Sequence, residues 1–288
     1  MNGYAARRRG LWRRRILALL GLGALAVLAW LAVGAVKDLV STDTHGAQVE
    51  HVTIHSKAVG EDLEVAVVVP EDAAAKPPLL VFLHGRGGDE DSNLTDQMYA
   101  ALADEGSAAP VVAFPDGGDD SYWHDRADGD WAEYVMNEVI PEVPDEFGAD
   151  PSSVAIGGIS MGGFGALDLA RLHPGRFCAV GGHSPALWQT GAETAEGAFD
   201  DEADFDSHNV VGAAQANPAP YMTQPDWLDA GDEDPFLPGD DAFTAALENA
   251  GAPITVKHWP GGHEGDYWND HWDEYMAFYA KALAHCRG

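Results

Sequence analysis

The sequence predicts an α/β domain with a mostly parallel, doubly wound β-sheet, and three observations indicate this fold class. Short apolar runs recur along the chain, each ending in glycine, proline or a polar turn, which is typical of strands buried on both faces. Stretches with helical periodicity alternate with these runs, as in successive βαβ units. Of the 288 residues, 46% are hydrophobic, which is enough for the core of one large domain.

The predicted strands and helices alternate from residue 51 onward. Two alternating stretches at 51–57 and 63–69 predict an antiparallel hairpin with its turn at 60–62. Later strands, which are continuously apolar, are expected at 79–83, 111–114, 154–156, 177–180, 226–230 and 254–259. Helices are expected at 93–104, 131–147, 161–172, 240–250 and 267–286. Residues 187–222 lack periodicity, so we expect an irregular excursion or a lid there.

The first 50 residues differ in composition from the rest of the chain. Residues 1–15 contain six arginines, and residues 16–36 carry no charge over a length that is sufficient to cross a bilayer. The positive-inside rule then predicts a cytoplasmic tail at 1–15, a transmembrane helix at 16–36 and a domain outside the cytoplasmic membrane. The alternative is a signal peptide cleaved after Ala35, which releases a secreted domain. We interpret the polar segment 37–50 as a linker and 51–288 as the domain.

Charge is distributed very unevenly along the chain. Seven of the 16 basic residues precede Ser41, as does one of the 47 acidic residues, which leaves nine basic and 46 acidic residues beyond that point. A domain so strongly anionic is not expected to bind nucleic acid or to dock on anionic lipid. The charge is expected to serve solubility.

The chain contains two cysteines, Cys178 and Cys286. The first is expected at the start of a strand and the second at the end of the last helix. In a parallel α/β sheet both positions lie at the same edge, so the two sulfurs are able to meet. A disulfide in an oxidising compartment is one prediction, and two separate thiols are the other.

The segment 158–162 (GISMG) fits the nucleophile-elbow pattern G-x-S-x-G. It follows a predicted strand and opens a predicted helix, and its small residues allow the sharp turn that presents a serine hydroxyl. The N–H groups and the dipole at the start of the helix favour a developing oxyanion. Ser160 is therefore the predicted nucleophile, and the alternative is an ordinary glycine-rich turn between a strand and a helix.

A serine nucleophile needs a histidine base oriented by a carboxylate, which follow it in the order acid, then histidine. The loop after strand 226–230 supplies Asp234 as the predicted acid. Asp232 is its rival, because the spacing permits either residue. The glycine-rich loop after strand 254–259 supplies His263 as the predicted base.

The loop 84–88 (HGRGG) follows the predicted strand 79–83, where an oxyanion hole is completed in such folds. The expected donors are the main-chain N–H groups of Arg86 and Met161. As a phosphate-binding loop this segment lacks both G-x-G-x-x-G and the P-loop lysine. We therefore expect no nucleotide site, and no cofactor or metal.

The motifs HGxGG, GISMGGFGAL, GDEDPF and GGH resemble those of the esterase family of α/β-hydrolases, which includes the esterase D or S-formylglutathione hydrolases, feruloyl esterases and bacterial mycolyltransferases. The resemblance extends from about Val65 to the C-terminus. It implies an α/β-hydrolase fold, a triad of Ser160, Asp234 and His263, and oxyanion-hole donors at Arg86 and Met161.

Two features depart from the family pattern. The family often has a tryptophan soon after the catalytic histidine, whereas here residues 264–267 separate His263 from Trp268. A membrane anchor is also foreign to the cytosolic thioesterases of the family. The substrate and location of those enzymes are therefore not carried over.

Several side chains near the predicted carboxyl edge of the sheet are candidates for substrate binding. Trp123, Arg126 and Trp131 follow the strand 111–114, and His183 follows the strand 177–180. The aromatic residues of this stretch, Tyr122 together with the two tryptophans, are expected to line an acyl or aryl pocket. Arg126 is expected either to bind a carboxylate or to pair with Asp125 or Asp128.

The expected function is hydrolysis of a small-molecule, lipid or sugar ester through an acyl-serine intermediate, outside the cytoplasmic membrane. One alternative is transfer of the acyl group to a sugar or lipid alcohol, as in the mycolyltransferases. The other is a non-catalytic envelope protein that retains the fold.

Overall fold

The computed structural model describes residues 42–286. The predicted tail at 1–15, the predicted transmembrane helix at 16–36 and the first five residues of the predicted linker, 37–41, lie outside this range. In the part of the chain that the structure describes, no helix is both long enough and apolar enough to cross a bilayer. A compact domain begins at Thr44.

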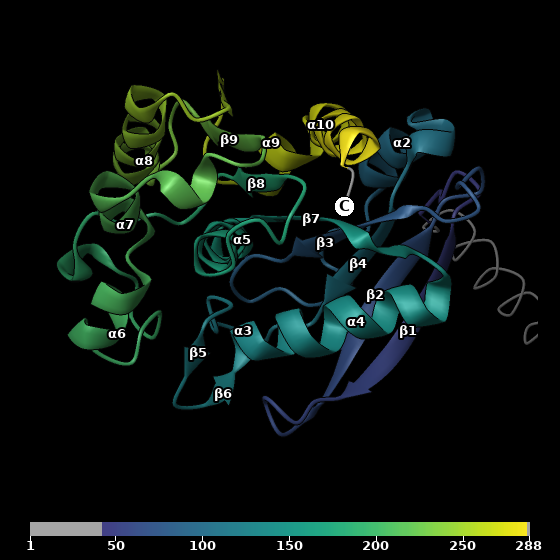
Figure 1. The fold of residues 1–288 in the computed structure, drawn as a ribbon, viewed down its shortest axis with the longest axis horizontal. Helices are drawn as coiled ribbons and strands as arrows, with labels where there is room; N and C mark the ends of the chain where they lie inside the picture. The colour runs from purple at the N-terminus through teal and green to yellow at the C-terminus, as the bar shows by residue number, and fades with distance from the viewer. Residues whose placement is uncertain (1–41, 287–288) are drawn as a thin grey trace, which may run out of the picture. The chain divides into compact units, whose positions relative to one another are not determined.

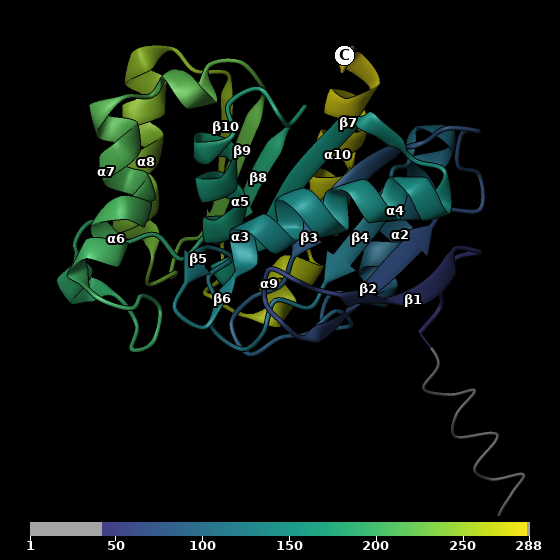
Figure 2. The same ribbon diagram turned by 60° about the horizontal axis from the view of Figure 1, so that its bottom comes forward.

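An eight-stranded sheet forms the centre of the domain, in the order β1-β2-β4-β3-β7-β8-β9-β10 (Figures 1 and 2). β2 pairs antiparallel with both β1 and β4, and every other neighbouring pair is parallel. The prediction of a mostly parallel sheet is confirmed. The strands are β1 Gln48–His55, β2 Asp62–Val69, β3 Pro78–Leu83, β4 Val111–Pro115, β7 Asp150–Ile159, β8 Val180–His183, β9 Asp226–Gly231 and β10 Ile254–Trp259; β5 Asp125–Arg126 and β6 Gly129–Asp130 form a separate small hairpin.

Helices cover both faces of the sheet, as Figure 1 shows with α3 to α5 on one side and α2 and α10 on the other. Two separate hydrophobic cores pack against the sheet. Along β2, Val65 and Val67 belong to one of them, whereas Ala66 and Val68 belong to the other. Each central strand is therefore buried on both faces. The helices are α2 Asp96–Asp104, α3 Trp131–Tyr134, α4 Ile140–Phe147, α5 Met161–Leu172, α6 Glu202–His208, α7 Val210–Ala216, α8 Leu237–Ala250, α9 Gly265–Asn269 and α10 Trp272–His285.

The structure corrects several predicted bounds. β1 begins at Gln48, so the last residues of the predicted linker belong to the sheet. The strand expected at 177–180 lies at Val180–His183, because Val180 is the first residue that pairs with both neighbouring strands. The helix expected at 267–286 is divided into α9 and α10.

The excursion at 187–222 is not irregular throughout. It contains α6 and α7, whose N-termini are capped by the side chains of Asp201 and Asn209. Phe205 and Val210 are among the residues it buries against the domain. These helices have seven residues each, which is too short for a clear helical period to stand out in the sequence.

The two cysteines meet at one edge of the sheet. Cys178 lies two residues before β8, and Cys286 directly follows α10. Their sulfurs are in disulfide contact, with Cα atoms 5.5 Å apart. This separation is within the range of protein disulfides.

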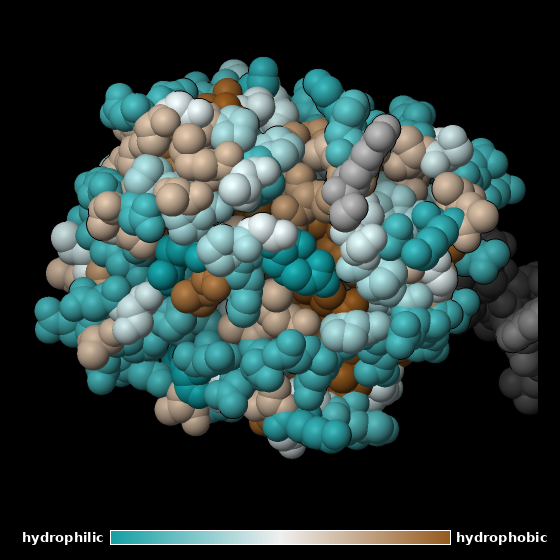
Figure 3. Space-filling model, viewed as in Figure 1, coloured by the Kyte–Doolittle hydropathy of each residue, from teal (hydrophilic) through white to brown (hydrophobic). Residues whose placement is uncertain are grey.

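The face of the domain in Figure 3 is largely hydrophilic, with smaller hydrophobic areas between the polar side chains. Of the large hydrophobic residues in the described range, Leu172 and Met222 are the exposed ones. The excess of acidic residues therefore lies on a surface with little apolar area.

Candidate active site

Ser160 lies in the turn between β7 and α5, with φ 56° and ψ −113°. A non-glycine residue with such a backbone is strained and needs support from its surroundings. Its N–H donates to the carbonyl oxygen of His183 over 3.0 Å, and its own carbonyl oxygen accepts from the N–H of Ala186 over 3.0 Å. A Cβ atom at Gly158 would lie 2.5 Å from the carbonyl carbon of Gly162. The motif therefore needs its small residues because main chains pack against each other at this turn.

Three predicted side chains form one hydrogen-bonded series. Ser160 Oγ lies 2.8 Å from Nε2 of His263, and Nδ1 of His263 lies 2.8 Å from Oδ2 of Asp234. The Asp234 side chain is fully buried, whereas that of His263 is 21% exposed. Since the carboxylate can only accept, Nδ1 carries the proton and Nε2 is free to accept the serine proton.

The two candidate acids occupy different places in the loop after β9. Asp234 uses Oδ2 for His263 and accepts the N–H of Phe236 with Oδ1 over 2.8 Å. Asp232 instead accepts the N–H of Gly261 over 3.2 Å. The structure therefore brings Asp234 to the imidazole, and Asp232 contacts the main chain of the loop that carries His263.

A third carboxyl group, Asp240, lies in the first turn of α8 and is completely buried. Neither of its oxygens has a hydrogen-bond partner among residues 42–286. Burial raises the pKa of Asp240 well above its ordinary value, and the negative charge of Asp234 raises it further. The raised pKa favours the neutral form of Asp240, in which it places no second negative charge beside Asp234.

The predicted oxyanion donors flank the serine. Met161 is the first residue of α5, so its N–H has no acceptor in a preceding helical turn. The loop after β3 passes close to Ser160: a Cβ atom at Gly85 would lie 3.4 Å from the serine Cβ. In this loop the N–H groups of Gly87 and Gly88 donate to Asp119 and Gly85. Within residues 42–286 the N–H of Arg86 donates to no main-chain oxygen, which leaves it available to a substrate oxygen.

His84, which sequence reasoning left without a role, holds this loop in place. Its side chain is buried, with Nδ1 2.8 Å from the carbonyl oxygen of Gly85 and Nε2 accepting the N–H of Gly117 over 2.9 Å. The indole N–H of Trp123 donates to the carbonyl oxygen of His84 over 3.2 Å. These bonds orient the main chain just before the expected donor at Arg86.

Ser160 and His263 open onto a cavity of about 510 Å³. Four aromatic side chains line it, together with Asn93, Asn269 and the loop that carries Arg86. The four are Tyr122, Phe236, Trp268 and Trp272. Tyr122 belongs to the aromatic stretch that was expected to line the pocket. The other three were not predicted to bind substrate, although Trp268 follows His263 closely in the sequence.

The structure corrects the expectation that Trp123 and Trp131 line the pocket. Both lie among the described residues but not in the cavity wall. Trp123 is fully buried and packs against Gly117 and Gly165, where a Cβ atom would overlap its ring. Trp131 is 8% exposed and packs beside Gly118 and Gly129. The aromatic residue of this loop that reaches the cavity is Tyr122.

The expectation for His183 is corrected as well, because this side chain is fully buried inside the domain. Its Nδ1 lies 2.7 Å from Oδ1 of Asp229, and its Nε2 lies 2.9 Å from the hydroxyl of Tyr279. It contacts the core behind the elbow and does not form part of the cavity wall.

Arg126 binds the protein itself, as one of the two alternatives predicted. Its side chain is 8% exposed and forms ion pairs with Asp128 over 3.4 Å and with Asp200 over 3.2 Å. It also donates to the carbonyl oxygens of Asp120 and Gly197. Arg126 therefore joins the loop before α3 to the excursion at 187–222.

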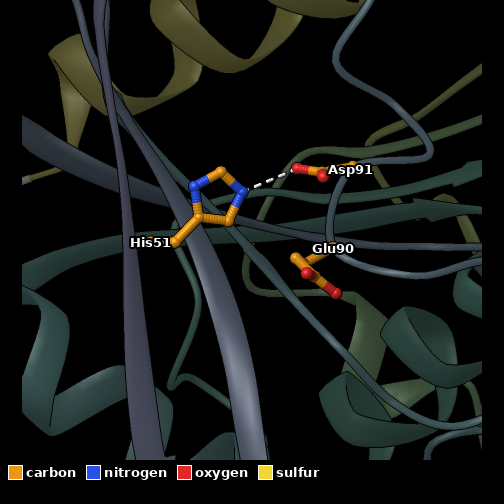
Figure 4. Close-up of side chains that lie close together, drawn as sticks. All are labelled: His51, Glu90 and Asp91. Atoms are coloured by element: carbon orange, nitrogen blue, oxygen red, sulfur yellow. Dashed lines mark hydrogen bonds and ion pairs between the residues drawn. The ribbon is translucent and has the colours of Figure 1, made fainter.

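Among residues 42–286, one group of histidine and acidic side chains brings three potential metal ligands within 4.8 Å of one another: His51, Glu90 and Asp91 (Figure 4). His51 Nε2 and Asp91 Oδ1 lie 2.7 Å apart, and their side chains are 42% and 58% exposed. A surface hydrogen bond accounts for the short distance between His51 and Asp91, and we propose no metal site at this cluster.

The sequence of this chain is similar to those of known proteins over most of the described domain. A family model described as "Putative esterase" matches residues 56–278. An esterase of Mycobacterium tuberculosis is 26% identical over 264 residues, which cover 78% of this chain and 58% of that protein. A diacylglycerol acyltransferase/mycolyltransferase of Mycobacterium leprae is 27% identical over 188 residues, which cover 62% of this chain and 56% of that protein. The chain thus spans little more than half the length of these relatives.

The fold also matches solved structures. A ferulic acid esterase superposes with a TM-score of 0.72 and 22% sequence identity, covering 82% of this chain and 98% of that one. At this level of identity the likeness concerns the fold alone. The α/β-hydrolase fold expected from the sequence motifs is confirmed.

Proposed function

Because the chain belongs to the esterase family whose model it matches over residues 56–278, we propose that it is a serine hydrolase that cleaves carboxylic esters. The observation that carries this proposal is the series of hydrogen bonds from Ser160 through His263 to the buried Asp234. A neutral imidazole held between a serine hydroxyl and a carboxylate is the arrangement that activates serine as a nucleophile.

In the proposed reaction, Ser160 Oγ attacks the ester carbonyl carbon while Nε2 of His263 takes the hydroxyl proton. The negative charge that develops on the carbonyl oxygen is stabilised by the N–H groups of Arg86 and Met161. His263 then gives its proton to the departing alcohol, which leaves an acyl-Ser160 ester. Water attacks this ester as His263 accepts its proton, and the acid is released when the proton returns to Ser160. Asp234 holds Nδ1–H and stabilises the imidazolium.

The cavity supports a small-molecule ester as the substrate. A volume of about 510 Å³ lies within the range of small-molecule sites. Its aromatic wall favours an apolar or aromatic group on one side of the ester bond. A lipid or sugar ester would place only the part next to the scissile bond inside the cavity.

The proposal is tested with p-nitrophenyl acyl esters and a fluorophosphonate probe. We expect the wild type to release free acid, also in the presence of glycerol or trehalose, and to be labelled at Ser160. The Ser160→Ala variant should neither turn over nor label, because it lacks the hydroxyl but keeps the backbone. Labelling that persists in Ser160→Ala would contradict the assigned nucleophile.

Acyl transfer is a second candidate, which the similarity to a mycolyltransferase supports. The chemistry is shared up to the acyl-serine, after which an alcohol takes the place of water. Acylated glycerol or trehalose among the products would favour this candidate over hydrolysis. A wild type that is neither labelled nor active would favour a non-catalytic envelope protein.

We also propose that the domain lies outside the cytoplasmic membrane, anchored by residues 16–36 or released after Ala35. The uncharged segment behind six arginines supports this orientation. The contact between Cys178 and Cys286 gives further support, since disulfides persist in oxidising compartments.

Protease treatment of intact cells tests this location. The domain should be digested while a cytoplasmic marker protein survives, because an exported domain is accessible and the marker is not. A variant lacking residues 1–36 should stay inside and be protected. Survival of the full-length domain alongside the marker would contradict the proposed orientation.

A further inference from the structure

A second buried carboxylate, Asp229, lies in β9 five residues before Asp234. Its Oδ1 contacts Nδ1 of His183 and accepts the indole N–H of Trp227, both at 2.7 Å. Its Oδ2 accepts the hydroxyl groups of Tyr267 over 3.0 Å and Tyr275 over 2.8 Å. The carboxyl group is fully buried, and each of its four partners carries a group able to donate a hydrogen bond to it.

The two phenols are fixed as donors to this carboxylate. Burial raises the pKa of the Tyr267 hydroxyl far above its ordinary value, and the charge of Asp229 raises it further. The same two causes raise the pKa of Tyr275. Both hydroxyls therefore keep their protons at neutral pH and act as donors to Asp229.

Asp229 connects the three segments that carry the triad. It lies in the strand that leads to Asp234. Its partner His183 accepts the N–H of Ser160 with its carbonyl oxygen over 3.0 Å. Its partner Tyr267 lies in α9, four residues after His263.

Tyr267 also packs against the loop that carries His263. The ring lies against Gly261, where a Cβ atom would be 2.9 Å from its Cδ2. The side chain is buried, and its hydroxyl reaches Asp229 in β9, the strand beside the edge strand β10. This bond joins the segment of the base to the sheet that carries the nucleophile.

We propose that Asp229 is a positioning residue, which holds His263 at the correct distance from Ser160 through the hydroxyl of Tyr267. The inference rests on the proposed function of the triad. Reacting groups have to be held within about 0.5 Å of the productive geometry. Without the Tyr267 bond, α9 and the loop before it lose their link to Asp229 and are less restrained relative to the elbow.

Tyr275 provides a matched control within the same network. It donates to the same oxygen of Asp229 over a similar distance, but it lies in α10, twelve residues from His263. If Asp229 were only a buried charge that needs donors, the loss of either hydroxyl would have the same effect. If it positions the base, the loss of the Tyr267 hydroxyl has the larger effect on turnover.

The test compares Tyr267→Phe with Tyr275→Phe, using kcat, KM and Tm. Both variants should lower Tm by similar amounts, because each removes one donor from a buried carboxylate. Tyr267→Phe should lower kcat about 10- to 100-fold with KM nearly unchanged, since displacing a catalytic group by about 1 Å can cost that much. Tyr275→Phe should lower kcat less than about twofold. Equal losses of kcat in the two variants, or none in Tyr267→Phe, would overturn the proposal.

A readout that does not depend on turnover separates this inference from the proposed function. The Nδ1 proton of His263, shared with Asp234, is observed by proton NMR and assigned by its loss in His263→Ala. We expect its resonance to shift or broaden in Tyr267→Phe and to stay in place in Tyr275→Phe. A wild type without esterase activity would refute the function, whereas an unmoved resonance in Tyr267→Phe would refute the positioning role.

Discussion

Replacing His263 by alanine is expected to lower kcat/KM for ester hydrolysis about 10⁴-fold or more, as loss of a triad base does elsewhere. Nε2 of His263 lies 2.8 Å from Ser160 Oγ. Among the described side chains, no other titratable group is hydrogen-bonded to this hydroxyl. Without the imidazole the serine keeps its proton and is a poor nucleophile. Turnover of a p-nitrophenyl ester measures the loss.

His258→Ala is the matched control for this experiment. His258 lies in β10, five residues before His263, and its side chain is 40% exposed. Its loss should change kcat/KM less than about threefold, as expected for a surface substitution. Similar kinetics in the two variants would show that His263 is not the base, provided that thermal unfolding finds both variants folded.

The second large effect is expected for the triad acid. Asp234→Asn should lower kcat about 10⁴-fold, because an amide favours the wrong imidazole tautomer while keeping the shape of the side chain. Asp234 is fully buried and faces Nδ1 of His263 at 2.8 Å. The residual rate should come from the oxyanion hole and from substrate binding.

Asp232→Asn is the natural comparison, because the sequence permits either acid. Asp232 is exposed and contacts the N–H of Gly261 through Oδ1. An asparagine carbonyl can accept the same bond, so kcat should fall less than about tenfold. A larger loss in Asp232→Asn than in Asp234→Asn would reverse the assignment.

The alternation of short apolar runs with helical periodicity predicted the order of the main strands and helices, because the strands of a sheet covered on both faces are continuously apolar. It was less reliable where a buried strand is short. The apolar run at 177–180 begins with Phe177, which is buried but does not pair with a neighbouring strand. β8 therefore begins at Val180, three residues after the predicted start. This shift explains the wrong expectation for His183, which was placed after the strand but lies within it, with its side chain in the core.

The side chains of the elbow were predictable because main-chain geometry demands particular residues there. Which residues form the cavity wall was not predictable, because their direction depends on turns in which non-glycine residues adopt positive φ. Tyr122 and Trp123 both have positive φ, at 50° and 59°. Two adjacent left-handed residues turn the tyrosine toward the cavity and the tryptophan into the core, whereas the sequence marks both equally as aromatic. The Asp229 network escaped prediction because its members come from four separate elements.

Arg86 has a further consequence for how this site can change. Its main-chain N–H is the proposed oxyanion donor, while its guanidinium donates to the carbonyl oxygen of Glu196 over 2.8 Å. The excursion that carries Glu196 also contributes Ala195 to the cavity wall. Arg86 therefore links the segment that lines the substrate cavity to the main-chain group proposed to stabilise the transition state. Remodelling the excursion to admit a larger ester would alter the rate constant of the chemical step along with the affinity.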